Sequence, residues 1–160
     1  MKRFLGAVKG ASSALSAIAG AALALLMLLT VADVVLRIFG RPIVGTYELV
    51  AVAGALAIGL SLPITSWVRG HIYVDSFTAK LPRPARTALA VATRLLVIGL
   101  FAVAGWNLLK YAGSLRRAGE VTPTLHVPFY PVVIALGVSC FVECVVMAAD
   151  IVRTLGGGDE

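Results

Sequence analysis

The chain has 160 residues, of which 59% are hydrophobic and only 14% are charged, and its formal net charge is +6. Soluble domains are about 45–50% apolar and about 25% charged, so this composition excludes a water-soluble globule and, because disorder requires low hydrophobicity, a disordered chain. The bases lie between apolar runs, which favours membrane lipid as a partner and argues against nucleic acid.

The first uncharged run extends from Gly10 to Ala32 and can cross a bilayer. At about 1.5 Å per residue, a helix of this length covers the roughly 30 Å of hydrocarbon. Basic residues precede the run, as in a signal peptide, but signal peptides have apolar cores of only about 7–15 residues. We therefore predict a basic cytoplasmic N-terminus over residues 1–12 and a retained first span over about 13–36.

Charged residues surround the connector between the first two spans. Asp33 and Arg37 are four residues apart, so their side chains can meet on one helix face. Glu48 opens the next span, after a connector over 38–46 that we expect to lie flat at the membrane interface. A cluster of Asp33, Arg37 and Glu48, with Arg41 as a further candidate, would fix how the two helices join. The alternative is a solvated charged rim.

The second span is predicted over 47–68, where an uncharged run is flanked by aromatic residues typical of the membrane interface. Pro63 lies in its last turns. Because proline has no N–H, it frees a carbonyl that Ser61, Thr65 or a neighbouring helix must satisfy.

A polar stretch with prolines follows over 69–86, and we predict a loop on the membrane surface there. Pro84 is well placed to open the third helix, since its missing N–H is one that a helix start leaves unbonded anyway. No further proline occurs up to residue 115, so the third helix, with a span over about 85–109, should project beyond the bilayer core.

Prolines at 123, 128 and 131 argue against a regular helix before the fourth span, which is predicted over about 132–152. Residues 153–160 are expected to form a cytoplasmic tail. The N-terminus, second loop and tail carry eight Lys and Arg against five in the other loops, which favours both termini in the cytoplasm. The predicted fold class is an all-α integral membrane protein with four transmembrane helices.

Two ionisable residues fall at membrane depth, where a charge costs about 2.5–3.5 kcal/mol. Helical rise places Arg94 about 9 Å and Glu143 about 12 Å from the same face. One hypothesis is an ion pair or hydrogen bond between Arg94 and Glu143. Alternatively, Arg94 reaches the headgroups while Glu143 is protonated or faces a polar neighbour. A proton or ion pathway through Glu143 is a third possibility.

The sequence indicates no catalytic, metal, cofactor or substrate-binding site. Both histidines, His71 and His126, lie in predicted loops, so a haem within the bundle has no histidine ligands. Cys140, Glu143 and Cys144 on one helix offer at most three metal ligands within lipid, and the cysteines are interpreted as packing residues. Neither a phosphate-binding glycine loop nor a nucleophile elbow is present.

Small residues recur on three helices and would allow helix backbones to approach closely in lipid. They are Ala17, Gly20, Ala21 and Ala24 on the first, Ala51, Gly54, Ala55 and Gly59 on the second, and Gly99, Ala102 and Gly105 on the third. One small bundle cannot bury small faces on every helix, so we expect some of them to meet another subunit.

Three segments together resemble a known family. Residues 32–48, ADVVLRIFGRPIVGTYE, resemble the end of helix one and start of helix two in the small membrane subunit (DctQ type) of tripartite ATP-independent periplasmic (TRAP) transporters. Residues 70–75, GHIYVD, resemble the loop after helix two of that family, although Tyr73 replaces a residue that is often basic. Residues 122–130 resemble the segment before helix four. The resemblance covers about residues 14–152.

This resemblance implies a non-catalytic scaffold subunit in the cell inner membrane. Its implied partners are a large permease subunit (DctM type), which holds the substrate and sodium sites and works by an elevator motion, and a periplasmic solute-binding protein. The implied process is sodium-driven uptake of an organic anion such as a carboxylate. Arg37, Glu48, His71 and Asp75 match motif positions, and structural or docking roles are expected for them.

Two other functions remain open from the residues alone. One is a self-sufficient, oligomeric small carrier or channel that uses Glu143, and the other is a membrane enzyme or redox subunit that uses the cysteines. Transport by the purified chain alone in liposomes would favour the first. Loss of function when both cysteines are replaced by serine would favour the second.

Overall fold

The computed structural model describes residues 2–68 and 82–155, and its elements there are helices. They are α1 (Lys2–Ile38), α2 (Thr46–Trp67), α4 (Arg83–Ala118) and α5 (Tyr130–Leu155). All four are long and apolar enough to cross a membrane. The predicted all-α architecture with four candidate spans is therefore confirmed. His71 and Asp75 lie outside the described residues.

The helices extend further than the apolar runs. α1 begins at Lys2, and Val8 and Ser12, which were expected in an N-terminal tail, are buried. Bases do not prevent a helix from continuing into the headgroup region, so charge is a poor marker of where a helix starts. α4 begins with Pro84 in its first turn, as predicted. With 37 and 36 residues, α1 and α4 are about 55 Å long, so they tilt or project beyond the hydrocarbon.

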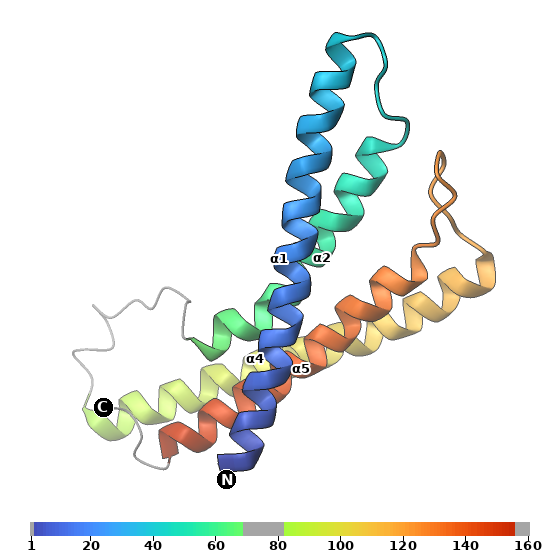
Figure 1. The fold of residues 1–160 in the computed structure, drawn as a ribbon. Helices are drawn as coiled ribbons and strands as arrows, with labels where there is room; N and C mark the ends of the chain where they lie inside the picture. Colours follow the sequence, from blue (N-terminus) through green and yellow to red (C-terminus); the bar gives the residue numbers. More distant parts are fainter. Residues whose placement is uncertain (1, 69–81, 156–160) are drawn as a thin grey trace.

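The helices form two antiparallel hairpins that cross (Figure 1). α1 packs along α2, α4 packs along α5, and α2 contacts α5 where the hairpins meet. Glycine brings α4 and α5 together: a Cβ on Gly105 would lie 3.1 Å from the Cβ of Cys140 and 3.2 Å from the carbonyl oxygen of Gly137. Gly105 is therefore used within the bundle, as small residues in membrane helices often are.

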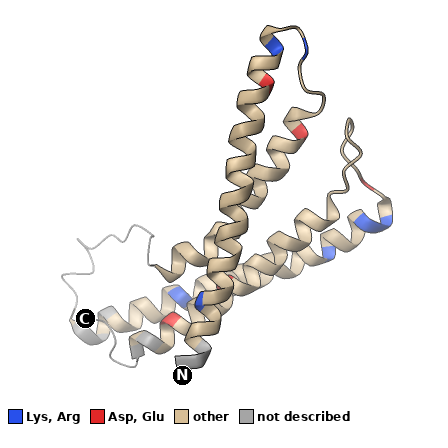
Figure 2. Cartoon of the chain, viewed as in Figure 1, with Lys and Arg blue, Asp and Glu red and all other residues tan. Residues whose placement is uncertain are grey.

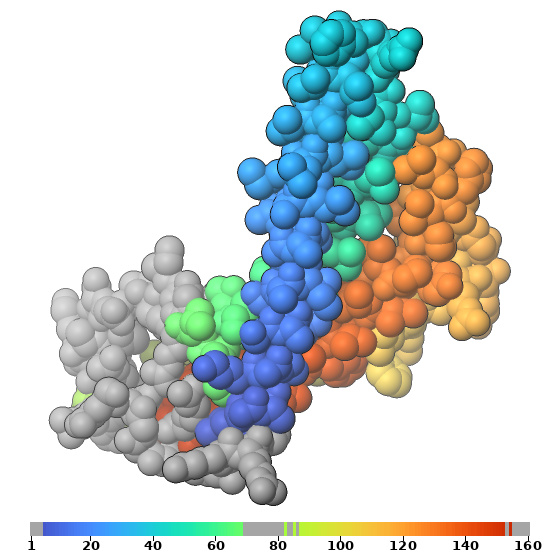
Figure 3. All heavy atoms as spheres, in the orientation of Figure 1, coloured from blue at the N-terminus to red at the C-terminus, as the bar shows by residue number. Residues whose placement is uncertain are grey.

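Charged residues lie mostly near the helix ends, and the long middle stretches carry almost none (Figure 2). Large apolar side chains cover the outside of these stretches, among them Leu28, Leu96 and Leu100, each with about 70% of its surface exposed. In the space-filling view, α1 is uncovered along the face turned to the viewer (Figure 3). Such a surface requires hydrocarbon or a protein partner around it.

The small residues divide between inside and outside. Gly59 and Gly105 lie at contacts between helices, whereas Ala17, Gly20 and Ala21 on α1 are exposed. This division agrees with the expectation that one small bundle cannot bury every small face. The exposed set on α1 is left for lipid or for another subunit.

Candidate functional site

Asp33 anchors the connector between α1 and α2. Its Oδ2 accepts a hydrogen bond from Arg37 Nη2 at 2.7 Å, and its Oδ1 accepts one from the backbone N–H of Ile43 at 2.8 Å. Asp33 is only 5% exposed, while Arg37 is 54% exposed. The contact expected from the four-residue spacing is thus present, and it ties the connector back onto α1.

Glu48 bonds to the loop between α4 and α5, not to the Asp33 and Arg37 pair. Its Oε1 accepts from the N–H of Thr124 at 2.7 Å, and its Oε2 accepts from the N–H of Leu125 at 3.0 Å. We call this pair of bonds the loop latch. The predicted three-residue cluster is wrong in this respect, because both oxygens of Glu48 accept from two loop amides that need an acceptor, while Arg37 donates to Asp33.

Gly45 allows the loop to come this close. Its φ is +81°, and a Cβ there would lie 2.5 Å from Cγ of Leu125. Glycine meets both demands, since it adopts positive φ readily and has no side chain. The first and third segments of the family resemblance, which are far apart in the sequence, therefore form one structural unit at one end of the molecule.

The loop that carries the latch has its own internal bonds. Thr122 donates its N–H to the carbonyl of Val127 at 2.9 Å, and its Oγ1 accepts from the N–H of Val127 at 3.0 Å. Thr122 is 1% exposed, and His126 closes the turn with φ at 55°. The family resemblance included Thr122 and Leu125 in its third segment, but sequence reasoning assigned no bonding role to either residue, although a threonine beside Pro123 is a common turn signal.

We expect Gly45→Ala to destabilise the folded chain, by about 1–2 kcal/mol from backbone strain alone and by more through the clash with Leu125. Thermal unfolding in detergent measures the loss. Adding Leu125→Ala should remove the clash but leave the backbone strain, so it should restore only part of the lost stability. Gly113→Ala is the matched control, because Gly113 is helical with open space around it. An equal effect at Gly45 and Gly113 would contradict this account.

A serine from α5 compensates for the proline in α2. Pro63 has no N–H to give to the carbonyl of Gly59, four residues earlier. Ser139 Oγ, 1% exposed, donates to that carbonyl at 2.6 Å. The hydroxyl of Ser61 instead donates to the carbonyl of Ile58, and the hydroxyl of Thr65 donates to the carbonyl of Ser61. Of the three donors considered from the sequence, the neighbouring helix is the one used.

This geometry predicts coupling between Ser139 and Pro63. Ser139→Ala should cost about 0.6 kcal/mol, the average for hydrogen bonds between membrane helices, and at most about 1.7 kcal/mol. In a Pro63→Ala background the restored N–H can bond the Gly59 carbonyl, so the same serine change should cost much less. A double-mutant cycle on unfolding free energies measures the difference. Additive losses would show that the Ser139 hydrogen bond does not compensate for the missing N–H of Pro63.

Glu143 also joins α5 to α2. Its Oε1 accepts from Ser66 Oγ at 2.5 Å, and Glu143 and Ser66 are 2% and 5% exposed. This contact matches the hypothesis that Glu143 faces a polar neighbour. Ser66 was not singled out from the sequence, because a serine in the last turn of a span carries no signal by itself.

Arg94 pairs with Asp150 and not with Glu143, which corrects the first hypothesis for these residues. Its Nη2 lies 2.7 Å from Oδ2 of Asp150. The register of α4 on α5 is the cause, because Cys144 lies opposite the carbonyl of Ile98. Glu143 then lies about 7.5 Å along the axis from Arg94, and Asp150 follows two turns later on the same face of α5.

α5 therefore presents one polar face to two neighbours. Ser139, Glu143 and Asp150 are spaced by four and seven residues, which places them on one side of the helix. The first two bond α2, and the third bonds α4. In the ranges 2–68 and 82–155, no three His, Cys, Asp or Glu side chains gather as metal ligands.

Comparison with known families identifies the chain. The family described as "Tripartite ATP-independent periplasmic transporters, DctQ component" matches residues 26–157. The chain belongs to this family. It is a DctQ-type small subunit of a TRAP transporter, a multi-pass membrane protein that associates with other TRAP components. No curated protein matches this DctQ chain. The matched range includes the loop latch, the bond of Ser139 to the Gly59 carbonyl and the ion pair of Arg94 with Asp150.

Proposed function

We propose that this DctQ subunit is a non-catalytic scaffold of its transporter, in the cell inner membrane with both termini in the cytoplasm. It supports a large permease subunit (DctM type) in sodium-coupled uptake of an organic anion such as a carboxylate. A periplasmic solute-binding protein delivers that anion. Family membership supports the assignment to the transporter, and the geometry of the chain supports the structural role.

One observation carries the structural role: polar side chains inside the spans bond to other parts of the same chain. Ser139, Glu143 and Arg94 reach Gly59, Ser66 and Asp150 respectively. A carrier that works alone needs ionisable groups facing a substrate path. Here the same kinds of group hold helices together, which is what a scaffold requires.

The exposed groups support docking to other components. Arg37 keeps about half of its side chain accessible beside the connector, and small residues of α1 face outward. We assign Arg37, His71 and Asp75 to subunit docking, and Asp33, Glu48, Arg94 and Glu143 to pairing within the chain.

Co-purification tests the proposal. The tagged chain is expressed with a large permease subunit of the DctM type, and we expect a complex that takes up the anion only with a sodium gradient and the binding protein. The chain alone in liposomes should give no flux. Flux through the chain alone, abolished by Glu143→Gln, would establish the independent carrier and overturn the scaffold assignment.

A further inference from the structure

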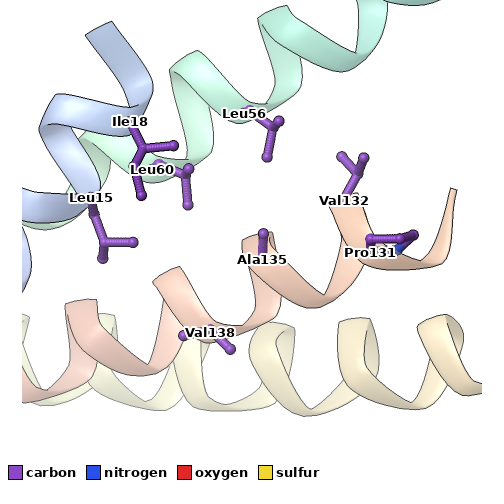
Figure 4. A pocket seen from close by; sticks show the side chains of 8 residues that line it. All are labelled: Leu15, Ile18, Leu56, Leu60, Pro131, Val132, Ala135 and Val138. Carbon is purple, nitrogen blue, oxygen red and sulfur yellow. The ribbon is translucent and has the colours of Figure 1, made fainter. Parts of the chain in front are cut away.

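An apolar groove separates the two hairpins within the membrane-spanning part of the chain. It has a volume of about 430 Å³. Leu15 and Ile18 of α1, Leu56 and Leu60 of α2, and a face of α5 line it (Figure 4). The residues from α5 are Pro131, Val132, Ala135 and Val138. Every one of these residues lies within a candidate span.

The chain itself closes the groove at both ends. At one end α2 and α5 cross, where Ser139 bonds the carbonyl of Gly59. At the other end the loop latch joins the start of α2 to the segment before α5. Between these two contacts the hairpins diverge, so the groove opens sideways toward the surrounding membrane.

The lining decides the chemistry of the occupant. All eight side chains around the groove are apolar, so water or a polar solute would find no hydrogen-bond partner among them. Apolar cavities exclude water and take apolar guests. Protein interiors are close-packed, and an empty space of this size would forfeit dispersion contacts around its wall.

The size distinguishes lipid from a partner helix. A helix with its side chains is about 10–12 Å across, so 430 Å³ holds only about one turn of it. A spanning helix needs about 20 residues. A hydrocarbon chain is much thinner, and in a bilayer it is the apolar group that surrounds the open side of the groove.

We propose that this groove is a lipid site that holds one acyl chain of a membrane phospholipid between the two hairpins. The acyl chain would fill the space between the hairpins, which the helix crossing at Ser139 and the loop latch hold open. The lipid would then be a structural part of the subunit, supporting the angle between the hairpins. This inference does not depend on the proposed scaffold function.

Photo-crosslinking tests the site. The full chain, with any co-purifying subunits, is reconstituted with a phosphatidylcholine that carries a diazirine on one acyl chain, and adducts are mapped by mass spectrometry. We expect adducts on Leu56, which points into the groove (Figure 4) and is half-buried. A change in its labelling when the groove is filled separates lipid in the groove from bulk lipid on the outer surface.

A matched pair of variants provides the control. Ala135→Phe places a ring in the groove and should reduce the adducts on Leu56 several-fold. Val145→Phe adds the same ring on α5 at an exposed position outside the groove, and it should leave those adducts unchanged. If no large subunit co-purifies, the same labelling is done on the chain alone, so failure of the proposed function and failure of this site are distinguishable.

Two results would overturn the proposal. One is the absence of adducts on Leu56 in the wild-type chain. The other is cross-linking of Ala135→Cys, with Cys140 and Cys144 replaced by serine, to another polypeptide, which would show that a protein side chain fills the groove.

Discussion

Reversing the charge of Arg94 is expected to destabilise the folded chain by about 3–5 kcal/mol, the usual cost of breaking a buried ion pair by changing one partner. Arg94→Glu would place two carboxylates together, because Arg94 and Asp150 are both mostly buried and only 2.7 Å apart. Asp150→Arg in the same chain should recover most of the loss. Unfolding in detergent, followed by circular dichroism, measures all three variants.

Glu143 supplies the control for this pairing. Glu143→Arg combined with Arg94→Glu should give no recovery, because the register of α4 on α5 keeps these positions about 7.5 Å apart along the helix axis. Rescue by Glu143→Arg and not by Asp150→Arg would contradict the structure. Such a rescue would instead support the pairing of Arg94 with Glu143 that their depths along the helices first suggested.

Removing the carboxylate of Glu48 should release the loop between α4 and α5. Glu48→Ala takes away the acceptor of two backbone amides, those of Thr124 and Leu125. Hydrogen exchange at these two amides should therefore become fast. The amide of Glu120 bonds the carbonyl of Leu115 at the end of α4, so it should stay protected and serves as an internal control.

Glu48→Gln refines the test of the loop latch. An amide side chain keeps one acceptor oxygen and replaces the other with a donor. Protection should then survive at one of the two amides and be lost at the other. Equal protection in Glu48→Ala and the wild type would show that the latch does not hold the loop.

The sequence was sufficient for features that depend on neighbours in the chain. Long apolar runs predicted four spans because lipid leaves the backbone few alternatives to a helix. The spacing of Asp33 and Arg37 predicted their contact, since both lie on the last turns of one helix. The missing N–H of Pro63 predicted a carbonyl in need of a donor.

Features that depend on distant parts of the chain were not accessible. Glu48 finds its donor 76 residues away, at Thr124, and nothing in the local pattern indicates this. The partner of Arg94 depends on helix register, which close contacts such as that of Gly105 with Gly137 fix. Depth alone placed Arg94 and Glu143 at similar levels because it assumed that the ends of the two helices lie level, whereas the contact of Cys144 with Ile98 shows that they are offset.

The proline in α2 has a consequence for biosynthesis. When the first two spans leave the ribosome and enter the bilayer, the carbonyl of Gly59 has no donor within its own helix. Its donor, Ser139, is synthesised 80 residues later. An exposed carbonyl in hydrocarbon costs several kcal/mol. Insertion of the last span therefore completes the backbone bonding of the second, so a truncated subunit should be recognised by quality-control proteases.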